Sequence, residues 1–269
     1  MNFRISDFAH AAAGFQSIID HVPGGDRVHV EALFGLASTL EWQRPGPNLD
    51  RARELYQKII TDYPQSEFVP WSALDLARMK ANPDYNVESD RVKGVPAYQE
   101  VIDKYPGTMA ADEALILQQT LRTASYDPTE MKDVITVLTR FVMAKPNSHF
   151  AATAWYIIGT TALHMKDHLL ARNSYVSCYD VDIAQKATVM RGFRTFDDEC
   201  SLLYAIGALS EFKLGDFATA RKYYNQLLTD FPKDWRAFTV QQAIERMARI
   251  EAGGTLDVPG VIDPSRRGS

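Results

Sequence analysis

The chain has 269 residues, of which 46% are hydrophobic and 23% are charged, so it holds enough apolar side chains for a substantial folded core. Its net charge of −5 argues against nucleic acid as the main partner, because phosphate binding needs a concentrated positive field. No apolar run reaches about 18 residues, so the sequence predicts no transmembrane helix.

Residues 6–20 predict an amphipathic helix that caps one end of the fold, with Ser6 as its N-cap. The N-terminal residues lack the apolar core of a signal peptide. We therefore expect a cytoplasmic protein, or a periplasmic one if an export signal has been removed.

Five pairs of helices are expected to follow: 27–43 with 49–62, 67–80 with 90–104, 109–124 with 130–144, 148–165 with 168–182, and 198–213 with 217–230. A second cap helix is expected at 235–251, and the Gly- and Pro-rich residues 253–269 predict a flexible tail. The pairs define repeats at about 27–64, 67–106, 109–146, 148–185 and 198–232, within one repeat domain over residues 1–252.

The second helix of each pair carries the same frame: a small or β-branched residue, a large residue four positions later and, in four pairs, a proline that stops the helix. The five frames are Ala52–Tyr56–Pro64, Gly94–Tyr98–Pro106, Val134–Leu138–Pro146, Ala171–Tyr175 and Ala220–Tyr224–Pro232. Self-similarity at a period of about 40 residues predicts an all-α, right-handed solenoid of stacked helix pairs.

Acidic or amide residues stand four positions before each frame, where they would cap the second helices: Asn48, Asp90, Glu130, Asp167 and Asp216. Glu130 is the weakest of these caps, and Thr129 is the alternative there. The helices that follow the stopping prolines are expected to be capped by Ser66, Thr108, Ser148 and Asp234.

The repeats resemble the tetratricopeptide consensus in the spacing of Trp155, Gly159, Ala171, Tyr175 and Cys178, and again in Tyr204, Ala208, Ala220, Tyr224 and Pro232. The resemblance implies that small residues let two helices approach while aromatic rings fill the space beside them. The junctions DYPQSEFVPWSAL and KYPGTMAADEAL are similar to repeats of bacterial envelope proteins, of the outer-membrane assembly lipoprotein and Tol-Pal coordinator types. That similarity implies a periplasmic scaffold.

No phosphate loop, dinucleotide glycine motif, HExxH or GxSxG motif occurs, so no cofactor is expected. His164 and His168 could suggest a metal site, but Asp167 at a helix start places them on opposite sides of a turn. We therefore expect no metal site and no catalytic residue.

The stretch 186–199 lengthens the fourth repeat and holds Arg191, Phe193, Arg194 and Phe196. It is either a basic-aromatic recognition loop or a longer helix and loop whose rings pack on the core. The second interpretation is favoured, because loops tolerate insertions that have no function.

In tetratricopeptide arrays the first helix of each pair lines a concave groove. Transferred to this sequence, that groove would be lined by Trp71, Leu74, Arg78, Glu113, Ile116, Thr120, Tyr156, Thr160, His164, Leu202, Ala205, Leu209 and Phe212. Such a lining suits an apolar or amphipathic segment of a partner protein. The alternative is that several of these residues pack on neighbouring helices.

The leading hypothesis is a non-enzymatic scaffold that binds a protein or peptide segment in this groove, in a bacterial envelope assembly. Two alternatives remain open: a self-assembling structural subunit, and a helical accessory domain of an enzyme with its active site at 186–199 or His164.

Overall fold

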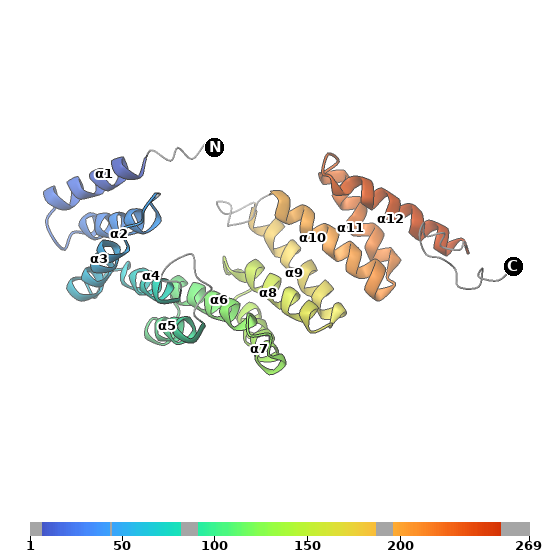
Figure 1. Cartoon of the computed structure of the whole chain (residues 1–269), viewed down its shortest axis with the longest axis horizontal. Helices are drawn as coiled ribbons and strands as arrows, with labels where there is room; N and C mark the ends of the chain where they lie inside the picture. Colours follow the sequence, from blue (N-terminus) through green and yellow to red (C-terminus); the bar gives the residue numbers. More distant parts are fainter. Residues whose placement is uncertain (1–6, 44, 82–90, 187–195, 254–269) are drawn as a thin grey trace. The chain divides into compact units, whose positions relative to one another are not determined.

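A computed structural model describes residues 7–43, 45–81, 91–186 and 196–253, and all regular structure within these ranges is helical (Figure 1). The elements in chain order are α1 (Phe8–His21), α2 (Arg27–Trp42), α3 (Leu49–Asp62), α4 (Val69–Ala81), α5 (Arg91–Lys104), α6 (Met109–Thr123), α7 (Pro128–Ala144), α8 (Ala151–His164), α9 (His168–Lys186), α10 (Phe196–Leu209), the π-helix η1 (Ser210–Leu214), α11 (Phe217–Asp230) and α12 (Arg236–Glu251). The predicted all-α fold of consecutive helix pairs is confirmed. No helix in the described ranges has both the length and the hydropathy needed to cross a bilayer.

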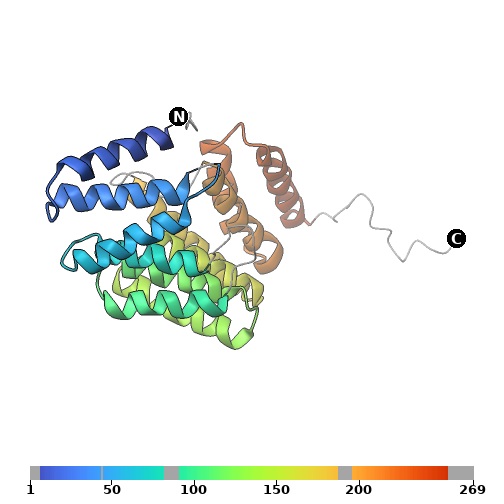
Figure 2. The same cartoon turned by 60° about the vertical axis from the view of Figure 1, so that its left-hand side comes forward.

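The chain divides into two compact units, Met1–Val134 and Ile135–Ser269, and each is described by itself. In the first unit, each helix from α1 to α6 packs on the next one along the chain, as Figures 1 and 2 show from two directions. In the second unit, each helix from α8 to α11 likewise packs on the next α-helix along the chain. The single continuous repeat domain expected from the sequence stays a prediction.

Several of the N-cap residues predicted from the sequence do cap their helices. Asn48, Thr108 and Asp216 each accept a hydrogen bond from a backbone N–H in the first turn of α3, α6 and α11. At α7 the prediction was wrong: Asp127 is the cap, because its carboxylate accepts from the N–H groups of both Thr129 and Glu130. Proline at position 128 moves the helix start upstream, since proline is well suited to a first turn. Ser6 and Asp90 lie outside the described residues.

Close helix contact in the second unit depends on glycines that face the buried tyrosines of the frame. A methyl group at Gly159 would lie 2.6 Å from the ring of Tyr175, and one at Gly207 would lie 2.3 Å from the ring of Tyr224. Both rings are almost fully buried. The expected role of Gly159 is therefore confirmed, and Gly207 makes a second close approach of the same kind, to Tyr224.

We predict that Gly207→Ala lowers the free energy of unfolding by about 1–3 kcal/mol, because the added methyl group overpacks the gap filled by Tyr224. Gly14→Ala, in α1, is the control: its methyl group meets no atom within 4 Å, so helix propensity should raise stability by roughly 0.5–1 kcal/mol. Urea unfolding followed by circular dichroism measures both. Equal stability of the two variants would contradict the packing argument.

Candidate functional site

The predicted groove residues of the first unit fall into two groups. Trp71, Arg78 and Glu113 are half-buried and reach solvent. Leu74 and Ile116 are only 1% and 5% exposed and pack inside the unit, so they support the helices and offer no side chain to a partner.

The predicted groove residues of the second unit divide in the same way. Tyr156 is 45% exposed and Phe212 is 61% exposed. Thr160 and His164 are also accessible, and the His164 ring nitrogen Nδ1 lies 2.8 Å from the Thr160 carbonyl oxygen. Leu209, 7% exposed, belongs to the core. Among the other members of the predicted lining, Thr120 is exposed, Ala205 is half-buried and Leu202 is buried.

The predicted recognition loop is only partly within the described chain. Arg191, Phe193 and Arg194 lie outside the described residues, and Phe196 is the first residue of α10. Helix α9 runs to Lys186, beyond the expected end at residue 182.

A buried carboxylate that the sequence reasoning missed links three helices of the first unit. Glu41, at the end of α2, is 0% exposed. Tyr56 of α3 donates its hydroxyl proton to Glu41 at 2.9 Å, and Arg78 of α4 donates from Nη2 and Nε at 3.2 and 3.3 Å. Because Glu41 of α2 accepts hydrogen bonds from the other helix of its own repeat and from the next repeat, it fixes the positions of the three helices together. We call Glu41, Tyr56 and Arg78 the first bridge.

The second unit repeats this arrangement in its last repeat. Glu211 of η1 is 7% exposed and accepts from the Tyr224 hydroxyl of α11 at 3.1 Å and from Arg246 Nε of α12 at 2.8 Å. Its π-helical turn ends at Gly215, whose φ of 65° lies in the left-handed region that glycine adopts without strain. Glu211, Tyr224 and Arg246 form the second bridge.

Each bridge places its arginine beside an accessible aromatic ring. The Arg78 guanidinium carbon lies 5.2 Å from the centre of the Trp42 ring, and that of Arg246 lies 5.0 Å from the Phe212 ring. Both distances fall within the range of cation–π attraction. Trp42 and Phe212 each follow the bridging glutamate in sequence, so the carboxylate and the ring are presented together.

The sequence does hold a signal for the bridges. A glutamate–aromatic pair, Glu41–Trp42 or Glu211–Phe212, ends the first helix, and the partner tyrosine is already a frame residue. The arginine completes the pattern, because Arg78 and Arg246 each stand fourteen residues after a helix-stopping proline, Pro64 or Pro232.

The electrostatics of the bridges keep their tyrosines protonated. Burial raises the pKa of Tyr56, and the charges of Asp75 and Glu41 raise it further. Burial, followed by the charge of Glu211, likewise raises the pKa of Tyr224. Each hydroxyl therefore remains a hydrogen-bond donor to its carboxylate at neutral pH.

Asp75 is a second acid at the first bridge and has no counterpart at the second, where Ala243 occupies the equivalent position. It is 7% exposed and forms a close ion pair with Arg78. Burial and the charge of Glu41 raise the pKa of Asp75 to about 7, against the opposing effect of Arg78. One arginine thus faces two carboxylates, and burial outweighs its attraction for Asp75.

The family comparison matches the two regions that contain the bridging glutamates and tyrosines. The tetratricopeptide repeat family model matches residues 31–66 and 202–234. These two regions are tetratricopeptide repeats. Such repeats are generally non-catalytic and serve as protein-interaction scaffolds. The sequence matches none of the curated proteins compared with it.

Two solved structures show the same tetratricopeptide-like fold at low sequence identity. BtubC (BKLC) from P. vanneervenii is 13% identical with a TM-score of 0.57, over 98% of this chain and 95% of that one. PilW, described as a widely conserved type IV pilus biogenesis factor, is 14% identical with a TM-score of 0.55, over 87% of this chain and 91% of that one. At these identities the likeness concerns the fold.

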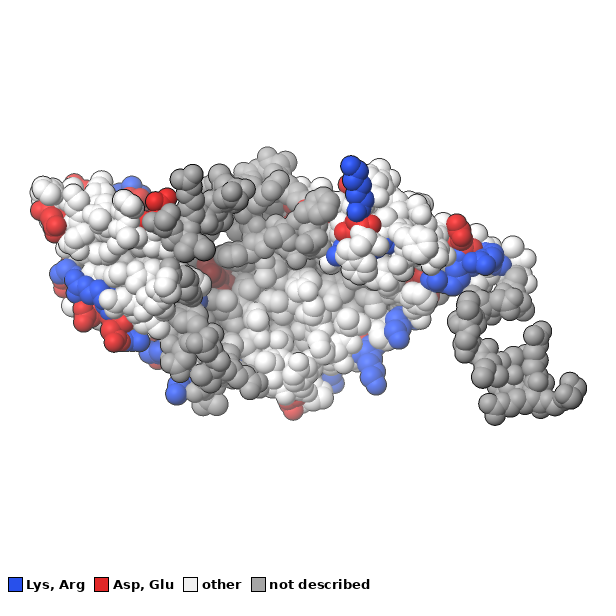
Figure 3. Space-filling model, turned by 45° about the horizontal axis from the view of Figure 1, so that its top comes forward, with Lys and Arg blue, Asp and Glu red and all other residues white. Residues whose placement is uncertain are grey.

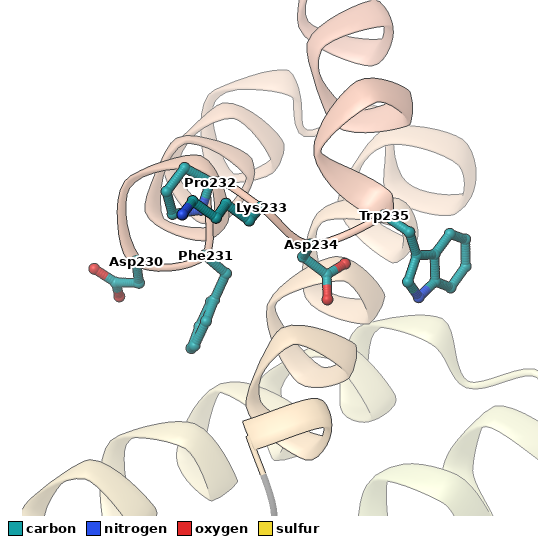
Figure 4. Close-up of a pocket in the computed structure, with 6 residues that line it drawn as sticks. All are labelled: Asp230, Phe231, Pro232, Lys233, Asp234 and Trp235. Atoms are coloured by element: carbon teal, nitrogen blue, oxygen red, sulfur yellow. The ribbon is translucent and has the colours of Figure 1, made fainter.

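Two other places were candidates for a site: a hollow between α11 and α12, and the histidines at the turn between α8 and α9. A hollow at the turn between α11 and α12 is lined by the consecutive residues Asp230–Trp235, and Figure 4 shows Phe231 and Trp235 directed to different sides of it. The Asp234 carboxylate there accepts a hydrogen bond from the Arg236 N–H as a helix cap.

Within the described ranges, no three His, Cys, Asp or Glu side chains gather as a metal site would require. His164 ends α8 and His168 begins α9, on opposite sides of the expected turn.

We predict that Glu211→Ala destabilises the second unit by roughly 3 kcal/mol, because it removes the acceptor from both Tyr224 and Arg246. Tyr224→Phe should cost about 1 kcal/mol, since it removes one hydrogen bond and keeps the ring. The exposed pair Arg51–Glu54 supplies the control, in which Glu54→Ala should change stability by no more than about 0.5 kcal/mol. Urea unfolding tests this order, and a Glu211→Ala effect as small as the control would refute the bridge.

The raised pKa of Asp75 predicts a specific pH dependence. The folded-state pKa of Asp75, about 7, lies above its unfolded value of roughly 3.9. The stability that the Asp75 carboxyl group contributes is therefore fully present below the unfolded pKa, and it is lost as the pH rises through the folded pKa. Wild-type stability minus that of Asp75→Asn should therefore fall between about pH 4 and 7, by up to about 1.4 kcal/mol per pH unit, and change little above pH 8. The exposed acid Asp103 provides the control variant Asp103→Asn, and urea unfolding at each pH provides the measurement. A pH-independent difference for Asp75→Asn would show that this carboxyl group does not titrate there.

Proposed function

We propose that this protein is a non-enzymatic scaffold that binds a segment of a partner protein on the accessible faces of its first helices. The observation that carries the proposal is the pair of aromatic–arginine surfaces beside the two bridges. Trp42 is 43% exposed next to Arg78, and Phe212 is 61% exposed next to Arg246.

Trp, Tyr and Arg are the residue types that contribute most to protein–protein binding energy, provided that neighbouring groups exclude water from them. Here each arginine is held by a buried glutamate before any partner arrives. Less side-chain freedom is therefore lost on binding, and the surfaces are prepared for a partner.

Other accessible residues of the predicted groove lie in each unit. In the first unit these are Trp71 and Glu113, which add an aromatic ring and an acceptor. In the second unit they are Tyr156, Thr160 and His164 on α8. On the face drawn in Figure 3, Lys, Arg, Asp and Glu side chains stand in small groups of both signs, with wide areas between them that hold none of these four residue types.

The non-enzymatic part of the proposal is supported by how the buried titratable groups are used. Glu41 and Glu211 are both occupied by tyrosine and arginine donors, which leaves them poorly placed to act as acids or bases. The family is also generally non-catalytic.

We further propose that the partner belongs to a bacterial envelope assembly, which would place the protein in the periplasm. The support is the fold shared with the pilus biogenesis factor PilW, together with the junction motifs after Tyr63 and Tyr105. Both are arguments by similarity, so the partner itself must be found by experiment.

The experiment is a pull-down from an extract of the source cells with the immobilised full chain, read by mass spectrometry. Trp42→Ala and Phe212→Ala should each reduce recovery of the partner at least about tenfold, as expected when a binding hot spot is truncated. Val28→Ala and Leu169→Ala remove exposed apolar side chains, 49% and 52% exposed, away from the bridges and serve as controls.

The proposed surfaces are wrong if both aromatic variants retain the partner as well as the controls do. The scaffold proposal itself is wrong if the wild-type chain retains no partner. Light scattering over a range of concentrations would then test the self-assembling alternative.

A further inference from the structure

A second surface of the first unit has the form of a binding groove and lies among α3, α4 and α5. Its volume is about 850 Å³. Each helix lines it with side chains at helical spacing, so the lining follows one stripe of each helix. We call this surface the α3–α5 groove. Its lining includes Arg53, Ile60, Leu76, Met79, Lys80, Lys93, Glu100, Val101, Lys104 and Tyr105.

The charge of the α3–α5 groove departs from that of the chain. Its lining contains four basic residues, Arg53, Lys80, Lys93 and Lys104, and one acid, Glu100, although the chain as a whole carries −5. The basic residues come from all three helices: Arg53 from α3, Lys80 from α4, and Lys93 and Lys104 from α5. Such a local excess of one sign attracts a ligand of the opposite sign.

Part of this positive charge is balanced within the protein. Arg53 lies 2.7 Å from Asp50, and Lys80 lies 4.0 Å from Glu100. Both are exposed pairs, in which solvent screens the attraction and the side chains exchange partners at little cost. Lys104 lies 5.4 Å from the ring centre of Tyr105, which also lines the groove, so its ammonium group is positioned over an aromatic surface.

The floor of the groove is apolar. Met79 and Val101 are buried at its base, and Ile60 and Leu76 are half-buried beside them. A ligand that filled the groove would therefore cover apolar side chains while its charged groups met the basic rim. Nucleic acid suits this floor less well, because its backbone offers charge without apolar side chains.

The groove is separate from the surfaces in the proposed function. It lies between the two second helices α3 and α5, and its lining includes none of Trp42, Trp71 or Arg78. A ligand bound there would leave the aromatic–arginine surface beside the first bridge untouched.

We propose that the α3–α5 groove binds a short acidic and amphipathic peptide segment of a partner protein, with carboxylates on the basic rim and apolar side chains on the floor. The scaffold would then hold two partner segments at once, one on its first helices and one between its second helices. This inference does not require the first-helix surfaces to be correct.

The test is a selection of random displayed peptides on the full-length protein, followed by counter-selection on the Lys93→Glu/Lys104→Glu variant. Peptides retained by the wild type and lost by the variant should be rich in Asp and Glu interspersed with apolar residues. Fluorescence anisotropy of the best peptide should show binding at least about tenfold weaker to that variant, and weaker binding as salt is raised.

Lys58→Glu/Lys132→Glu is the matched control, because it changes the net charge equally from exposed positions outside the groove and should alter the affinity less than about twofold. Phe212→Ala should bind the selected peptide as the wild type does, which separates this site from the first-helix surfaces. The proposal is overturned if no selected peptide depends on Lys93 and Lys104, if the dependent peptides are not acidic, or if an oligonucleotide displaces them more readily than free acidic peptide does.

Discussion

The bridging glutamate is the interaction on which the two repeats matched by the family model depend. A carboxylate removed from water destabilises a protein unless donors surround it, and in both bridges the donors come from the partner helix and from the helix that follows the repeat. Neither repeat can shift without leaving this carboxylate unsatisfied. Apolar packing provides most of the stability of such helix pairs, but it tolerates sliding, whereas a shared buried acceptor specifies one arrangement.

The same glutamate connects the fold to the proposed function. The buried glutamates hold Arg78 and Arg246 by hydrogen bonds. Each guanidinium group therefore lies in one position at the surface, beside one ring, that of Trp42 or Phe212. A scaffold needs contact groups that are ordered before the partner binds, and the bridges provide them at two places in the chain. The α3–α5 groove uses another property of stacked helix pairs, the space between successive second helices.

Much of the fold could be predicted from the sequence, because small residues, capping residues and prolines act over a few positions. The cap of α7 was missed since Asp127 and Thr129 compete within one turn, and only geometry decides between them. The candidate site was harder to predict from the sequence than the fold. Periodicity places Leu74 and Leu209 on first helices but cannot show that neighbouring helices bury them. The bridges escaped notice because Glu41 and Arg78 are far apart in sequence, and charged residues are ordinarily assigned to the surface.

Hydrogen–deuterium exchange of Glu211→Gln tests the central claim most directly, with Glu54→Gln as the surface control. A neutral amide of the same size cannot balance the charge of Arg246, so exchange in α12 and α11 should accelerate while α1–α6 keep the wild-type rate. The surface control should leave all three regions unchanged. If α12 of Glu211→Gln exchanges as slowly as in the wild type, the buried carboxylate does not hold the last helix in place, and the bridge is not what fixes the final repeat.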